Sequence, residues 1–150
     1  MWIRTLTTLE CTKLLSAERL GRLACAAEGK PYVVPIYYAF QDYHLYAFSM
    51  PGRKIDLMRA NPQVCVQVDA RGEGRGWQSV ILEGSYEELP DRIGFKRERD
   101  HAWSLLSKHS DWWEPGALKP VGGPQQVLSH SPHIFFRVVV SELSGREARE

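Results

Sequence analysis

The segment Ser49-Met50-Pro51-Gly52-Arg53-Lys54 places a hydroxyl, a glycine and two adjacent cations close together in the chain. It follows an expected strand and opens a short expected helix, whose first backbone N–H groups have no partner within the helix. The glycine lets a ligand approach the backbone, and the N–H groups and cations together favour a dianion. The segment therefore predicts a phosphate site. A solvated basic turn has the same composition, so the spacing alone leaves both interpretations open.

Pro35 stands inside the β-branched and aromatic run Tyr32–Phe40, which otherwise predicts a central strand. Proline cannot donate to a strand ladder, so it marks an edge position or a bulge. The backbone groups nearby would then be free to meet a flat heterocycle with donors and acceptors along its edge. Protection of an edge strand against aggregation is the alternative.

Two further sequence patterns could suggest a dinucleotide-binding loop and a metal site, but neither is supported. The run Gly72–Gly76 is similar to a dinucleotide-binding loop, but a strand beginning at Trp77 follows where that loop needs a helix, so we expect a hairpin loop. His130 and His133 flank Ser131-Pro132, and no cysteine or carboxylate stands at ligand spacing, so no metal site is predicted. No serine-histidine-aspartate order or nucleophile elbow supports hydrolysis.

Composition narrows the class of protein. The chain has 150 residues and a net charge of +1, which fits one domain over residues 1–150 and favours neither nucleic acid nor an anionic membrane as a partner. No stretch approaches the roughly 20 apolar residues of a membrane span. The N-terminus lacks the apolar core of a signal peptide, so we expect a cytoplasmic protein. The three cysteines are far apart in the sequence, odd in number and form no Cys-x-x-Cys pair, so they indicate neither a disulfide scaffold nor a zinc site: Cys11, Cys25 and Cys65.

Trp112 and Trp113 begin a stretch, residues 112–126, that is rich in proline and glycine and predicts an irregular excursion. Tryptophans usually fill a core, but a core role is harder to arrange in such a stretch. An interface, or a wall over a flat bound ring, is the other interpretation.

The expected elements suit a mainly β fold. A capping box at Thr7 and Glu10 begins a helix that ends before Gly21. Strands are expected over 20–27, 32–40, 43–49, 64–69, 77–88 and 134–143, helices over 54–59 and from 90 to about 108, and a polar tail after the last strand. Six strands joined mostly by short turns predict a closed or nearly closed antiparallel barrel with helices at its ends and in its longer connections.

Several short segments, in a fixed order along nearly the whole chain, match a known pattern. They are Gly21–Ala24, Pro31–Pro35, Leu45-Tyr46, Gly52–Lys54, Asn61-Pro62, Ser79-Val80, Glu83-Gly84, Trp112–Gly116 and Glu142–Gly145. With this order the chain resembles the pyridoxamine 5′-phosphate oxidase-like family of FMN-binding split barrels. It is most similar to the short flavoproteins grouped with nitroimidazole-resistance reductases.

The resemblance implies a six-stranded antiparallel split β-barrel with flanking helices, which forms a homodimer with FMN sites at the interface. It implies a phosphate site at Ser49, Arg53 and Lys54 and a strand facing the flavin ring that carries Ser79. It implies that four residues line the isoalloxazine with their backbone: Val34, Pro35, Ile36 and Tyr37. Apart from the resemblance, Trp112 and Trp113 are our candidates for a wall supplied by the partner subunit.

The implied function is an FMN-dependent oxidoreductase acting on a small organic substrate. Phe48 and Ser49 occupy the stretch where nitroimidazole reductases often carry a histidine, and Ser79 replaces a glutamine of pyridoxamine-phosphate oxidases. The C-terminal strand also lacks the arginine and histidine pattern of those oxidases, and no catalytic acid or base is evident. The alternatives are a non-catalytic flavin-binding or sensor module, and a split barrel that uses haem or a deazaflavin.

Overall fold

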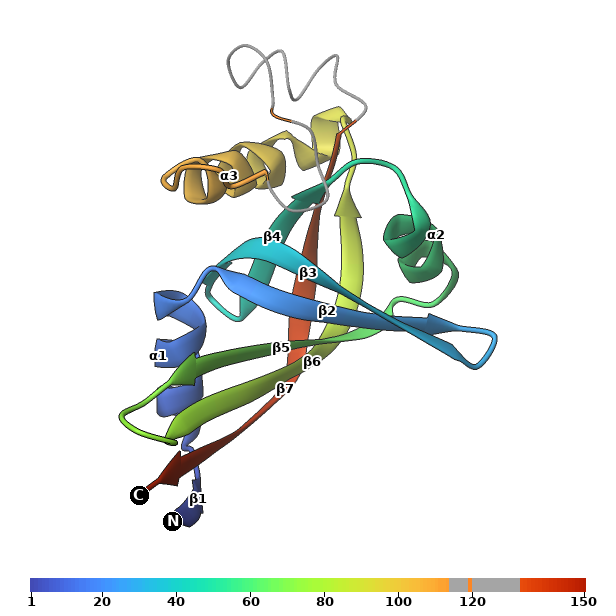
Figure 1. Cartoon of the computed structure of the whole chain (residues 1–150). Coiled ribbons are helices and arrows are strands. Elements are labelled where there is room, and N and C mark those ends of the chain that lie inside the picture. The colour runs from blue at the N-terminus through green and yellow to red at the C-terminus, as the bar shows by residue number, and fades with distance from the viewer. Residues whose placement is uncertain (114–118, 120–132) are drawn as a thin grey trace.

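A computed structural model describes residues 1–113, 119 and 133–150 of the chain (Figure 1). Among these residues, no helix is long and apolar enough to cross a membrane. The elements in chain order are β1 (Trp2–Thr5), α1 (Thr8–Ala17), β2 (Leu20–Ala27), β3 (Lys30–Gln41), β4 (His44–Ser49), α2 (Arg53–Ala60), β5 (Gln63–Arg71), β6 (Trp77–Leu89), a 3₁₀ turn η1 (Ile93–Phe95), α3 (Lys96–Leu106) and β7 (Ile134–Arg149).

Six antiparallel strands form a ring in the order β7-β4-β3-β2-β5-β6, and β6 closes the ring by pairing with β7. The two closing strands stay paired over almost their whole length, from Trp77 with Ala148 to Leu89 with Phe135. A glycine sits at the bulge in this ladder because a Cβ on Gly84 would lie 2.3 Å from the Val139 carbonyl oxygen. The predicted six-stranded antiparallel split barrel with flanking helices is confirmed.

The first helix starts at the predicted capping box. The Thr7 amide donates to Glu10 Oε1 at 3.0 Å, and the Glu10 amide donates to Thr7 Oγ1 at 3.2 Å. The helix buries its apolar face, formed by Cys11, Leu14 and Leu15, against the inside of the ring. The predicted capping box and helix are therefore confirmed.

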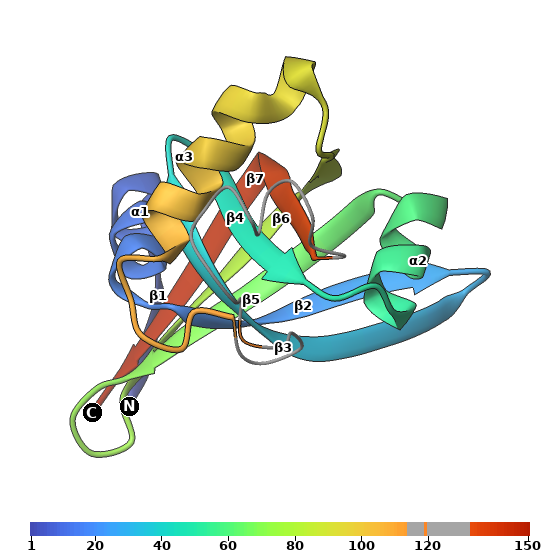
Figure 2. The same cartoon turned by 90° about the horizontal axis from the view of Figure 1, so that it is seen from above.

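The core has two parts. The larger cluster fills the ring, and the smaller one lies under α3, which crosses the β4 side of the barrel (Figure 2). In α3, Ala102, Leu105 and Leu106 are buried, while Phe95 just before it is half-buried. The helix is shorter than expected, since it begins at Lys96 and ends at Leu106.

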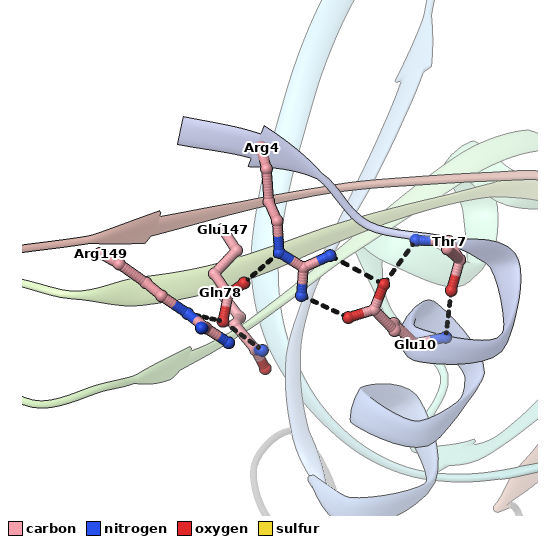
Figure 3. Close-up of polar contacts among 6 residues, drawn as sticks. All are labelled: Arg4, Thr7, Glu10, Gln78, Glu147 and Arg149. Carbon is pink, nitrogen blue, oxygen red and sulfur yellow. Dashed lines mark hydrogen bonds and ion pairs between the residues drawn. The ribbon is translucent and has the colours of Figure 1, made fainter. Parts of the chain in front are cut away.

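The prediction that a polar tail follows a last strand ending at residue 143 is wrong. β7 continues to Arg149, and its last four residues pair with β1, a strand that the sequence did not predict. Glu147 is buried there, and its carboxylate accepts from Arg4 Nε at 2.6 Å and from Gln78 Nε2 at 3.1 Å (Figure 3). Arg4 also donates to Glu10, so one guanidinium joins β1, β7 and α1.

Candidate functional site

The candidate phosphate segment lies where β4 gives way to α2. Ser49 is the last residue of β4, is fully buried, and donates its hydroxyl proton to the Met50 carbonyl at 2.8 Å. Pro51 and Gly52 are exposed, and a Cβ added to Gly52 would meet only the Met50 carbonyl oxygen, at 3.9 Å. No side chain caps the start of α2. The turn is therefore open on its outer side.

The two cations of this segment lie at different depths. Lys54 is half-buried and Arg53 is exposed, with the Arg53 guanidinium 4.7 Å from the centre of the Tyr32 ring. Burial lowers the pKa of the Lys54 ammonium, and the neighbouring Cys25 thiol acts in the opposite direction. A half-buried cation is therefore present in a setting that disfavours its charge unless an anion joins it.

Neither cation has a carboxylate within 4.0 Å in the part of the chain that the structure describes. Asp56, in the first turn of the same helix, forms no ion pair with either of them. Arginines elsewhere in the protein do have such partners: Arg4, Arg22, Arg59, Arg75, Arg137 and Arg149. The positive charge at the start of α2 is thus available to a bound anion.

The barrel is split beside this segment. β3 pairs with β2 over Lys30–Tyr37, but its ladder with β4 covers only Tyr38–Gln41. Within residues 1–113, 119 and 133–150, no strand pairs with the other edge of β3 before Tyr38. An open strand edge therefore runs from the neighbourhood of Arg53 toward the point where β3 meets β4.

The alternation of backbone directions along β3 decides which of its N–H and C=O groups face this open edge. The Tyr38 amide donates to the Arg19 carbonyl on the β2 side, at 2.9 Å. Because antiparallel ladders alternate, the amides of Val34 and Ile36 also face β2, while the amide and carbonyl of Val33 and the carbonyl of Pro35 face the open edge. Pro35 is tolerated because its missing N–H would have pointed to that unpaired edge.

The side chains of the four predicted ring-lining residues divide between two faces. Ile36 is buried in the core and half-buried Val34 packs against it, whereas Pro35 is exposed and Tyr37 is half-exposed on the outer face. The neighbouring Tyr38 is buried, and its hydroxyl donates to the Leu15 carbonyl at 2.8 Å. The predicted contact of residues 34–37 with a flavin ring therefore stays a prediction, and it concerns their backbone groups. Val33 is a further residue whose backbone groups face the open edge.

Ser79 lies elsewhere on the same chain. It stands half-buried on the outer face of β6, and Gln67 of β5 donates to its hydroxyl oxygen at 2.9 Å. Strands β2 and β5 separate it from β3, and three strand spacings amount to about 14 Å. Ser79 pairs with Arg146 near one end of β7, whereas Ser49 pairs with Ile134 at its other end, so one chain does not bring Ser79 together with Ser49 and the segment that follows it.

Trp112 takes part in the second core cluster. Its ring lies 4.8 Å from that of Phe48, the neighbour of Ser49, and 5.2 Å from that of Trp103. Trp113 is also half-buried against this cluster. Both tryptophans therefore pack against the core, although their sequence context made a core role harder to expect. The rest of the predicted excursion, apart from Lys119, lies outside the described residues.

A cavity lies far from this segment. It measures about 740 Å³ and is bounded by the loop 72–76 and the end of β7. This loop leaves the end of β5 that is opposite to α2. Glu147, the buried carboxylate on its wall, is already bonded to Arg4, Gln78 and Arg149. Size alone therefore does not make this cavity the better candidate.

Sequence reasoning missed three residues of the site. Tyr32 supports Arg53, Val33 presents free backbone groups, and Gln67 binds Ser79. Pro35 carried the signal for Val33, since residues two apart on a strand face the same edge. No local signal identifies Tyr32 or Gln67, because both contacts join segments far apart in the sequence.

Comparisons with known proteins agree with this architecture. The family model described as pyridoxamine 5′-phosphate oxidase matches residues 7–147. An uncharacterised protein of Rhizobium meliloti is 49% identical over 148 residues, which cover 99% of this chain and 97% of that protein. The crystal structure of a FAD-binding protein from Mesorhizobium loti shares 63% identity, with a TM-score of 0.83 over 99% of this chain and 100% of that one.

A candidate 5-nitroimidazole antibiotic resistance protein from Bacteroides thetaiotaomicron shares the fold, with a TM-score of 0.74. It is 19% identical and the match covers 98% of this chain and 89% of that one, so the likeness concerns the fold alone. The family match, by contrast, covers nearly the whole sequence and includes Ser49, Arg53, Lys54 and Ser79. The chain belongs to the pyridoxamine 5′-phosphate oxidase-like family.

Proposed function

We propose that this protein binds a flavin nucleotide through the phosphate of its ribityl chain, at Ser49, Arg53 and Lys54. The carrying observation is the pair of adjacent cations without a carboxylate partner, one of them half-buried. FMN, which the sequence predicts, ends in this phosphate. FAD contains the same phosphate and is the second candidate, because the 63% identical relative is described as FAD-binding.

The open edge of β3 suits the ring of the flavin. Isoalloxazine carries both donors and acceptors along one edge, and the Val33 amide with the carbonyls of Val33 and Pro35 offers the complementary set. These groups have no hydrogen-bond partner among the described residues. We therefore place the ring along β3, with the backbone of residues 33–37 beside it.

A second copy of the chain would complete the site. If Ser79 faces the same ring as β3, it must come from another subunit, because two strands separate them within one chain. The outer face of β2 and β3 also carries an apolar strip, in which Val33 is 61% and Leu20 is 40% exposed. A homodimer would cover this strip. The partner's wall over the ring, assigned to Trp112 or Trp113, belongs to the same proposal.

The proposed activity is that of an oxidoreductase acting on a small organic substrate. A bound flavin supplies hydride or electron transfer, and the protein supplies binding, orientation and exclusion of water. Ser79 accepts from Gln67, so its own hydroxyl proton remains available to donate to the ring or the substrate. A non-catalytic flavin-binding module uses the same binding residues and is the alternative.

The absorbance spectrum of the purified protein, with mass identification of the compound released on denaturation, tests the binding proposal. Flavin bands in the blue and near-ultraviolet are expected, whereas a Soret band, a deazaflavin or no binding of added flavin would contradict it. Stopped-flow reduction by NADH or NADPH then separates the two roles. Rapid reduction followed by transfer to an acceptor supports the enzyme, and tight binding with negligible turnover supports the module.

A further inference from the structure

We infer that Arg19 and His109 form a second anion site, which holds a carboxylate of the substrate, so that the substrate is a small organic acid. This inference rests on the proposed function, because it names the substrate class of the same flavin site. Arg19 directly precedes β2 and His109 follows α3, and the two residues meet beside Tyr37 of β3.

The side chains of Arg19 and His109 line one small cavity, which Tyr37 and Trp112 also border. Its volume of about 10 Å³ has room for one atom of the size of a water oxygen. The Arg19 guanidinium lies 5.9 Å from the centre of the Tyr37 ring. Stacking on an aromatic face leaves the N–H groups at the edge of a guanidinium free to donate. One carboxylate oxygen therefore has both room and a charged donor here.

The protein does not balance the positive charge at this cavity. Half-buried Arg19 forms no ion pair or side-chain hydrogen bond within the described parts of the chain, and its neighbour Glu18 does not pair with it. Desolvation and the positive charges of Arg19 and Lys108 lower the pKa of the His109 imidazole. A bound anion would offset this repulsion and accept hydrogen bonds from both Arg19 and His109.

The cavity lies at one end of the open edge of β3. At the other end of this edge, Arg53 contacts Tyr32. Arg19 contacts Tyr37, which stands five residues or about 17 Å further along the strand. The two cationic sites therefore lie at opposite ends of the edge along which we place the flavin ring. A substrate whose carboxylate is held by Arg19 would extend toward that ring and leave the phosphate site free.

Calorimetric titration of the flavin-loaded protein with benzoate and with its neutral analogue benzamide tests the inference. The flat ring of benzoate suits the aromatic walls of the cavity, Tyr37 and Trp112. The wild type should bind benzoate about tenfold or more tightly than benzamide, as one charge-assisted contact allows. Arg19→Gln should abolish this difference, and His109→Gln should reduce it. Benzoate should also shift the ring-proton signals of His109 and perturb the absorbance of the bound flavin.

Arg22→Gln is the matched control, because Arg22 lies on β2 close to Arg19 in the chain but is paired with Asp69 at 3.1 Å. It should keep the wild-type ratio of benzoate to benzamide affinity. Equal affinities of the wild type for the two compounds would overturn the inference, as would no binding of benzoate or binding that leaves the flavin spectrum unchanged.

A purified protein that takes up no flavin would instead refute the proposed function. Calorimetry and the His109 signals do not depend on flavin, so the two failures are distinguishable. His109 is exposed, so its variant carries the test even if Arg19→Gln unfolds.

Discussion

Arg59 and Glu88 form a two-pronged ion pair, with Nε to Oε1 at 2.7 Å and Nη2 to Oε2 at 3.0 Å. The pair ties the last turn of α2 to β6. At the first turn of the same helix, Arg53 and Lys54 have no carboxylate partner among the described residues. The helix is thus neutralised at its end and left positive at its start, which is the arrangement expected of an anion site.

Tyr38→Phe should lower stability without affecting flavin affinity. The buried Tyr38 hydroxyl donates to the Leu15 carbonyl at 2.8 Å, and burial raises the pKa of this phenol, so it stays protonated. Removing the donor leaves a buried acceptor unsatisfied, which costs about 1–3 kcal/mol. Urea unfolding measures the loss. A change of flavin affinity in the folded variant would show that Tyr38 belongs to the site.

Acid should weaken the junction of β1, α1 and β7 through Glu10. Hydrogen bonds from Arg4 and from the Thr7 amide hold the pKa of Glu10 at about 2, below its ordinary 4.5. Because the folded pKa is lower, the stabilisation is complete above about 4.5 and is lost as the pH falls toward about 2.

Thermal unfolding between pH 7 and pH 2.5 measures this effect. Glu10→Gln should lower the melting temperature at pH 7 and show a smaller further fall in acid than the wild type. Glu142→Gln, at an exposed position of β7, is the control and should follow the wild-type curve. Parallel curves for wild type and Glu10→Gln would rule out this role of Glu10.

Val33→Glu should shift the protein from dimer to monomer and weaken flavin binding at the same time. Val33 is 61% exposed on the strip assigned to the second subunit, and a carboxylate buried there would lack a partner. Ile93→Glu is matched in chemistry, because Ile93 is 98% exposed on η1, outside the strip. Sedimentation velocity gives the mass of each variant. A dimer that persists in Val33→Glu would remove this face from the interface.

Much of the fold could be predicted because its signals are local. The Thr7–Glu10 capping box and the alternation of Val64, Val66 and Val68 each specify an element over a few residues. The end of β7 could not be predicted, because Glu147 places a charge at a buried position and breaks the apolar alternation. Its burial depends on Arg4 and Gln78, which are remote in the sequence.

The candidate site was predictable where its residues are adjacent in the chain. Ser49, Arg53 and Lys54 lie within one turn, so their proximity followed from the sequence. The support of Arg53 by Tyr32 depends on how α2 packs beside β2 and β3, which is a tertiary contact. The free backbone groups of Val33 depend on which edge of β3 pairs with β2. No local sequence pattern predicts that pairing.

The central claim is that the phosphate of a flavin nucleotide is held by Arg53 and Lys54, and a binding cycle tests it most directly. The affinities of wild type and of the double variant Arg53→Ala/Lys54→Ala are measured for riboflavin, which has no phosphate, and for FMN. We predict that the double variant loses at least about 2 kcal/mol of FMN binding, since charge-assisted contacts contribute about 1.5–3 kcal/mol each, while riboflavin binding is unchanged. An FMN affinity equal to that of the wild type would contradict the account.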